Sequence, residues 1–175
     1  MIQDRVMSAI RDVADFPKPG IMFKDITPIM LDPKLSTDIV DHLAALYKDQ
    51  GIDKIAGIES RGFLFGYPVA MKLGIPFVLI RKAGKLPYHK LSYAYDLEYG
   101  SATIEIHVDA VKEGERVLIH DDLLATGGSA AAAAELIKKC GGEIAGFNFL
   151  VELGFLNGAE KLKNYTDNIT NLAGY

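Results

Sequence analysis

The chain has 175 residues, and 49% of them are apolar, which is enough to bury one substantial core and too short for two ordinary domains. The formal net charge of −4 argues against a nucleic-acid-binding surface, and no apolar run in the sequence is long enough to span a bilayer. Residues 1–15 lack the pattern of a secretory signal, and the only cysteine, Cys140, cannot pair within the chain, so we expect one domain, residues 1–175, in the cytoplasm.

The first predicted elements are two helices joined by a rigid loop. Apolar residues recur at helical spacing over Ile2–Val13, and two prolines and a glycine in residues 16–20 prevent this helix from continuing. Asp32 and Pro33 are typical of a helix cap and a first turn, and the second helix is expected to end near Gly51.

Short apolar runs then alternate with helical stretches. Strands are expected at Lys54–Ile58, Pro76–Ile80, Arg116–His120 and Glu143–Leu150, with intervening helices that end near Met71 and Cys140. This alternation predicts an α/β fold, a twisted and mainly parallel sheet flanked by helices on both faces. In such folds ligands bind beyond the carboxyl ends of the strands, so these ends are the first place to look for a site.

One interval breaks this alternation. Lys82–Tyr95 is rich in Lys, Tyr, Gly and Pro and has no clear period, which predicts a long mobile excursion. Apolar and polar residues alternate in the following Ala102–Val108, as in a half-exposed strand. We therefore expect a flexible flap over about residues 82–100.

The segment 116–129 combines a buried strand, a glycine-rich turn and the start of a helix. Gly127 and Gly128 allow a sharp turn, so that backbone N–H groups, the hydroxyls of Thr126 and Ser129 and the positive end of the helix can converge on a phosphate. This arrangement predicts a site for the 5′-phosphate of a ribose.

Two adjacent acids, Asp121 and Asp122, stand just before that turn, where they are expected to leave the strand. Carboxylates at this distance from a bound phosphate can accept hydrogen bonds from vicinal sugar hydroxyls. A solvated strand end followed by an ordinary turn is the alternative for each part alone. The combination of strand, acids, turn and helix favours a ribose phosphate site.

Positive charge is concentrated in the middle of an acidic chain. No acidic residue occurs between Glu59 and Asp96, whereas six cationic residues do: Arg61, Lys72, Arg81, Lys82, Lys85 and Lys90. A highly anionic ligand such as pyrophosphate would account for this, because Arg61 at a strand end can present a planar, bidentate guanidinium. A solvated loop with incidental lysines is the alternative.

Several segments resemble known motifs. Val117–Ser129 resembles the phosphoribosyl-pyrophosphate signature of type I phosphoribosyltransferases. Glu59–Gly66 is similar to the pyrophosphate loop of adenine phosphoribosyltransferases, and Arg81–Pro87 resembles the start of their catalytic hood. Phe16–Pro28 is similar to their adenine-binding hood, and Asp96–Gly100 resembles their flap motif.

This resemblance, which runs from Phe16 to about Leu153, implies a type I phosphoribosyltransferase fold with a small N-terminal base-binding hood over about residues 1–32. It implies that the phosphoribosyl group is bound by Asp121, Asp122, Ala125, Thr126, Gly127, Gly128 and Ser129. It further implies that pyrophosphate is held by Glu59, Ser60, Arg61, Arg81 and Lys85, and adenine by Met22, Phe23 and Lys24.

The implied catalytic residues are Glu98, Arg61 and Lys85. The acid of the family's flap motif faces the purine N7, so Glu98 is the candidate general acid, and this role requires burial to raise its pKa. His120 departs from the family pattern, in which this strand position is usually aliphatic. We interpret His120 as a structural, hydrogen-bonded histidine. His89 and Lys90 receive no role.

The function implied is a purine salvage transferase that converts adenine and phosphoribosyl pyrophosphate to AMP and pyrophosphate. Mg²⁺ is expected to arrive on the substrate, because no cluster in the sequence has metal-ligand spacing, and the family's habit predicts a homodimer. One alternative is a phosphoribosyltransferase for another purine such as xanthine. Another is a non-catalytic regulator that binds phosphoribosyl pyrophosphate, which would need a DNA-binding module and a basic face.

Overall fold

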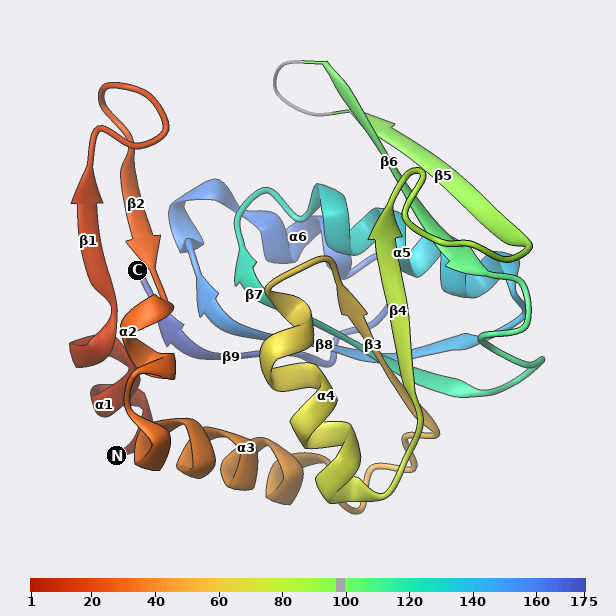
Figure 1. Ribbon diagram of the computed structural model, residues 1–175, viewed down its shortest axis with the longest axis horizontal. Coiled ribbons are helices and arrows are strands. Elements are labelled where there is room, and N and C mark those ends of the chain that lie inside the picture. Colours follow the sequence, from red (N-terminus) through yellow and green to blue (C-terminus); the bar gives the residue numbers. More distant parts are fainter. Residues whose placement is uncertain (97–99) are drawn as a thin grey trace.

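A computed structural model describes residues 1–96 and 100–175, and Figure 1 shows their arrangement around one large sheet. Its strand order over these residues is β5-β6-β4-β3-β7-β8-β9. The parallel strands are β3 (Lys54–Ile58), β4 (Phe77–Lys82), β7 (Arg116–Leu124), β8 (Glu143–Glu152) and β9 (Ile169–Gly174). The predicted α/β fold with a mainly parallel sheet is confirmed.

Helices cover both faces of the sheet (Figure 1). One apolar cluster joins the sheet to α1 (Ile2–Ala9), α3 (Pro33–Tyr47) and α4 (Gly62–Leu73). The other cluster joins it to α5 (Gly128–Lys139) and α6 (Gly158–Leu162). Strands β3, β7 and β8 are therefore buried on both sides, which explains their nearly continuous apolar sequences. None of the helices in the described residues combines the length and apolar character needed to cross a membrane.

The N-terminal region differs from its prediction. Helix α1 ends at Ala9, and β1 (Arg11–Ala14) pairs in antiparallel fashion with β2 (Met22–Asp25). The helical spacing of apolar residues up to Val13 was therefore misleading, because Val13 faces Phe23 across the two strands. Helix α2 (Thr27–Met30) follows, and α3 begins as expected, with the Asp32 carboxylate accepting a hydrogen bond from the Leu35 amide.

The flap interval is more regular than predicted. Its second half forms β5 (Lys90–Asp96), which pairs along its whole length with β6 (Ser101–His107) in antiparallel fashion, and β6 in turn pairs with the end of β4. Leu91, Tyr93 and Tyr95 alternate with exposed residues and pack on the apolar cluster around α5. The period of two was missed because tyrosines supply the apolar face. We call the paired strands the β5–β6 ribbon.

A buried polar chain crosses the core beneath the sheet's carboxyl edge. His120 Nδ1 lies 2.7 Å from the side-chain oxygen of Asn148. The side-chain nitrogen of Asn148 donates a hydrogen bond of 3.0 Å to the Thr170 hydroxyl. The Tyr47 hydroxyl is hydrogen-bonded to the same Thr170 hydroxyl. Among the described residues His120 Nε2 has no hydrogen-bond partner. Burial of the ring lowers the His120 pKa from 6.5 to about 4, against the smaller opposing effect of Asn148. The histidine is thus buried and hydrogen-bonded, as expected.

This lowered pKa makes a prediction about stability. Between pH 6.5 and about 4 the unfolded chain takes up a proton at His120 that the folded chain does not, so the free energy of unfolding falls as the pH falls, by roughly 3 kcal/mol over the window. Urea titrations at several pH values would measure this slope. His120→Leu should flatten the slope whatever its stability at pH 7, and His42→Gln, at an exposed position of α3, should keep it. Equal slopes for the wild type and His120→Leu would contradict the assignment.

Candidate active site

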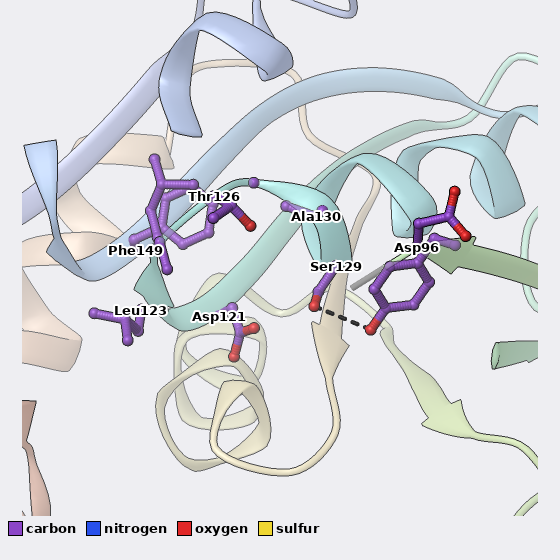
Figure 2. A pocket seen from close by; sticks show the side chains of 12 residues that line it. Asp96, Asp121, Leu123, Thr126, Ser129, Ala130 and Phe149 are labelled. Atoms are coloured by element: carbon purple, nitrogen blue, oxygen red, sulfur yellow. Dashed lines mark hydrogen bonds between the residues drawn. The ribbon is translucent and has the colours of Figure 1, made fainter. Parts of the chain in front are cut away.

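The turn between β7 and α5 forms the first of two neighbouring pockets. Gly127 has a φ of +76°, and a Cβ added to it would lie only 2.6 Å from the Gly158 carbonyl oxygen, so this position requires glycine on two counts. Thr126 and Ser129 flank it, and α5 begins at Gly128 with its amide groups facing the same space. The pocket has a volume of about 410 Å³, and Figure 2 shows it from close by. It fits a phosphate group held by backbone amides.

The paired acids lie inside β7 and do not leave the strand as expected, because β7 continues to Leu124. Asp121 accepts a hydrogen bond of 2.8 Å from the Asp122 amide and lines both pockets. Burial, and then the neighbouring Asp122 carboxylate, raise the pKa of Asp121 well above its ordinary value. Hydrogen-bond donors arriving from a ligand would favour its ionised form, so this carboxyl group is suited to receive hydroxyls.

Arg61 joins the β3 end of the site to the acids. Its Nε lies 2.6 Å from Asp122 Oδ2, and the Asp122 side chain is only 6% exposed whereas that of Arg61 is 45% exposed. The guanidinium carbon also lies 5.7 Å from the centre of the Phe23 ring in the hood. Arg61 thus stands where the hood, the acids and the loop after β3 meet, with part of its guanidinium open to solvent.

The second pocket, of about 610 Å³, lies between the loop after β3 and the end of β4. Both carboxylate oxygens of Glu59 accept hydrogen bonds of 3.2 Å from Arg81, and Oε2 also accepts one of 2.8 Å from the Lys82 amide. Burial acts to raise the pKa of Glu59, but these donors outweigh it and the net shift is downward. Glu59 therefore fixes the geometry of the pocket as an ionised carboxylate.

The cations at the end of β4 and in the turn after it differ in their positions. Arg81 is engaged by Glu59 and by the Lys85 carbonyl oxygen at 3.4 Å, so it braces the turn after β4. Lys85 is exposed on that turn and does not line the second pocket, whereas Lys82 and Tyr95 do. No role was expected from the sequence for Lys82 or Tyr95. Lys82 is one of the six cationic residues between Glu59 and Asp96, and that concentration of charge was the only sequence signal that pointed to it.

The hood brings an aromatic ring to the site. Phe23 on β2 is partly buried and packs edge-on against Phe16, with ring centres 5.1 Å apart. Met22 beside it is 51% exposed. The Lys24 ammonium turns away, 2.6 Å from Asp12 and over the ring of Tyr175, so only the backbone of Lys24 is available to a ligand. Glu98 lies outside the described residues.

The described residues contain no group of three or more His, Cys, Asp or Glu side chains placed to hold a metal ion. Among the carboxylates that line the two pockets are Asp121 and Asp122, and Asp122 is already paired with Arg61. This donor set suits a ligand that brings its own cation better than a cation held by protein groups alone.

Comparisons with known proteins agree with this geometry. Residues 30–170 match the family model described as a phosphoribosyl transferase domain. An adenine phosphoribosyltransferase from Cytophaga hutchinsonii is 51% identical over 175 residues, which cover 100% of this chain and 97% of that protein.

Two solved structures are similar as well. The crystal structure of adenine phosphoribosyltransferase from Thermoanaerobacter pseudethanolicus has a TM-score of 0.94 and 48% identity, and covers 99% of each chain. The enzyme from Saccharomyces cerevisiae, complexed with an imino-altritol bisphosphate and adenine, has a TM-score of 0.91 and 41% identity over 98% of each chain. The likeness includes the C-terminal tail beyond Leu153, which the sequence motifs did not reach.

The role of Asp121 and Asp122 can be tested by measuring the affinity for phosphoribosyl pyrophosphate. The double change Asp121→Asn with Asp122→Asn removes two charged acceptors, each forming bonds of about 1.5 to 3 kcal/mol, so affinity for phosphoribosyl pyrophosphate should fall roughly 100-fold or more. Titration calorimetry would measure this, with circular dichroism confirming the fold. Adenine analogues added alone should be affected less, and Asp109→Asn, at an exposed position after β6, should change nothing. Unchanged sugar-phosphate binding in the double variant would remove the acids from the site.

Proposed function

The chain belongs to the phosphoribosyl transferase domain family and, within it, to the adenine phosphoribosyltransferases, and from that premise we propose how its two pockets divide the substrates. The protein converts adenine and phosphoribosyl pyrophosphate to AMP and pyrophosphate, a step of purine salvage. The observation that carries the proposal is the acid pair near the end of β7, with Asp122 buried and paired with Arg61, followed by the glycine turn that opens α5.

The 5′-phosphate binds in the turn before α5. Backbone amides from Gly127 onward, the hydroxyls of Thr126 and Ser129 and the positive end of the helix supply the donors that a dianionic phosphate needs. Asp121 and Asp122 accept hydrogen bonds from the two ribose hydroxyls, which favours the ionised form of Asp121 that burial opposes.

Pyrophosphate occupies the second pocket. The amides after Glu59, the Ser60 hydroxyl and Arg61 bind it. Lys82 at the end of β4 lines the pocket, and Lys85 in the following turn adds positive charge from outside its lining. Arg61 exchanges its bond to Asp122 for one to the phosphate oxygens, which frees Asp122 for the sugar. Arg81 acts indirectly, by holding Glu59 and the turn.

Adenine lies in front of the hood, on the ring of Phe23 and near Arg61. Stacking of a base on an aromatic ring contributes about 1 to 3 kcal/mol. Backbone groups of Met22 and Lys24 read the edge of the base, in keeping with the engagement of the Lys24 side chain elsewhere. Amide donors and carbonyl acceptors suit adenine, whose amine donates and whose ring nitrogens accept, better than an oxopurine.

The reaction is a displacement at C1′ of the ribose. The bond between C1′ and pyrophosphate breaks as the adenine N9 attacks C1′, and adenine loses the proton of its imidazole ring to solvent. Positive charge develops on the sugar ring beside the two carboxylates, which stabilise it. Arg61 and the lysines stabilise the negative charge on the departing pyrophosphate. When bound together with phosphoribosyl pyrophosphate, Mg²⁺ would offset the negative charge of the phosphates of this substrate. The β5–β6 ribbon limits the access of water.

The domain organisation, compartment and oligomeric state are proposed from the family. We propose that residues 1–175 act as one domain, with the hood and flap as its parts, in the cytoplasm and as a homodimer. Exposed apolar side chains on α4, among them Leu64, Tyr67 and Met71, support an association of this kind because water is a poor environment for them.

The substrate assignment is tested by mixing the protein, Mg²⁺ and phosphoribosyl pyrophosphate with each free nucleobase in turn. Adenine should give AMP, and hypoxanthine, guanine and xanthine should react more slowly by a factor on the order of 1,000, because each would leave hydrogen-bonding groups of the site unpaired. Chromatography of the nucleotides would measure the rates. Faster turnover of an oxopurine than of adenine would contradict the assignment.

The role of Glu98 rests on the resemblance alone and is tested by Glu98→Gln. The amide cannot exchange a proton with N7, so turnover should fall about 100-fold or more while adenine affinity changes little. Steady-state rates and equilibrium binding of adenine would separate the two effects. A folded Glu98→Gln variant with wild-type turnover would exclude Glu98 from the chemistry.

A further inference from the structure

Tyr95 of β5 lies at the boundary between the two pockets. It lines both of them, together with Asp121, Leu123 and Ser129. Its hydroxyl oxygen lies 3.1 Å from Ser129 Oγ in the first turn of α5, and the dashed line in Figure 2 marks this bond. The bond therefore joins the β5–β6 ribbon to the turn that we propose for the 5′-phosphate.

The ribbon approaches this turn closely. A Cβ added at Gly128 would lie 3.7 Å from Cδ2 of Tyr95 and 3.9 Å from the Asp96 carbonyl oxygen, which are ordinary van der Waals distances. Tyr95 and Asp96 belong to the lining of the phosphate pocket itself. The end of β5 is thus a wall of that pocket, and the hydroxyl bond is its polar link to α5.

The chemistry of the two hydroxyls gives this link a direction. Each hydroxyl has one proton to donate and can also accept, so in the absence of a ligand either residue can be the donor. A bound phosphate presents only acceptors and would take the proton of Ser129. The Ser129 oxygen can then only accept from Tyr95, and the resulting chain runs from Tyr95 to Ser129 to the phosphate. Hydrogen bonds aligned in this way strengthen one another.

We propose that Tyr95 is a positioning residue that couples occupancy of the 5′-phosphate pocket to the order of the β5–β6 ribbon. The proposal rests on the placement of the 5′-phosphate in the turn before α5. Because such coupling is reciprocal, phosphate binding orders the ribbon and an ordered ribbon tightens phosphate binding by the same factor. The ribbon, which also borders the pyrophosphate pocket through Ala102 and Thr103, would then be in place before the reaction begins.

The chain supplies a matched control on the same strand. Tyr93 stands two residues earlier on the same face of β5 and packs on the same apolar cluster, but it lines neither pocket and its ring faces the Lys139 ammonium at 4.9 Å. Tyr93→Phe and Tyr95→Phe remove the same atom from the same ribbon. Only the second removes a bond to Ser129.

The experiment follows hydrogen exchange of residues 90–96 and 101–107 with and without saturating ribose 5-phosphate, alongside its affinity by calorimetry. In the wild type and in Tyr93→Phe, the ligand should slow exchange in the ribbon. In Tyr95→Phe at least half of this ligand-dependent slowing should disappear, and ribose 5-phosphate should bind about threefold to tenfold more weakly. Ser129→Ala should weaken binding too, and the double variant with Tyr95→Phe should weaken it by less than the product of the two single effects.

Two results would overturn the proposal in different ways. If Ser129→Ala weakens ribose 5-phosphate binding but Tyr95→Phe keeps both its affinity and its ligand-dependent protection, the phosphate placement stands and the coupling through Tyr95 is wrong. If Ser129→Ala leaves affinity unchanged and the wild-type ribbon shows no protection, the phosphate does not bind in this turn. The placement under the proposed function then fails together with the coupling.

Discussion

Two adjacent carboxylates in one strand, Asp122 buried and Asp121 partly buried, are the constraint that shapes the rest of the site. Both acids lie within β7, and removal from water together with the neighbouring Asp122 carboxylate disfavours the charged form of Asp121. Arg61 neutralises part of this charge from the neighbouring strand end, and the amides of the turn before α5 stand nearby. A sugar phosphate would satisfy both groups at once, because its hydroxyls can donate to the acids and its phosphate can accept from the amides of the turn.

The sheet makes this arrangement possible because its parallel strands bring distant segments to one edge. Residues 59–61 follow β3, the acid pair lies near the end of β7, and Arg81, which holds Glu59, lies near the end of β4. The order β4-β3-β7 places these three ends side by side. The hood adds Phe23 from a separate two-stranded sheet, so the base side of the site is not built on the main sheet.

Much of this was readable in the sequence because the signals are local. Apolar runs marked the buried strands, and the glycine turn after Asp121 and Asp122 marked the pocket that we propose for the phosphate. Features that depend on contacts between distant segments were missed. The strand at Arg11–Ala14 forms only because β2 lies beside it, and Tyr95 gains its position from α5. The cis peptide bond between Glu59 and Ser60 has no sequence signature, since no proline follows.

The contact between Gly127 and Gly158 makes the phosphate turn depend on a region that carries no recognisable motif. A side chain at Gly158 would press on the Ala125 carbonyl and on the turn itself. Surveys of harmful variants that weigh only motif residues would overlook this position. A substitution at Gly158 should impair the turn before α5 as a substitution within that turn would, although more than 25 residues separate the two in the chain.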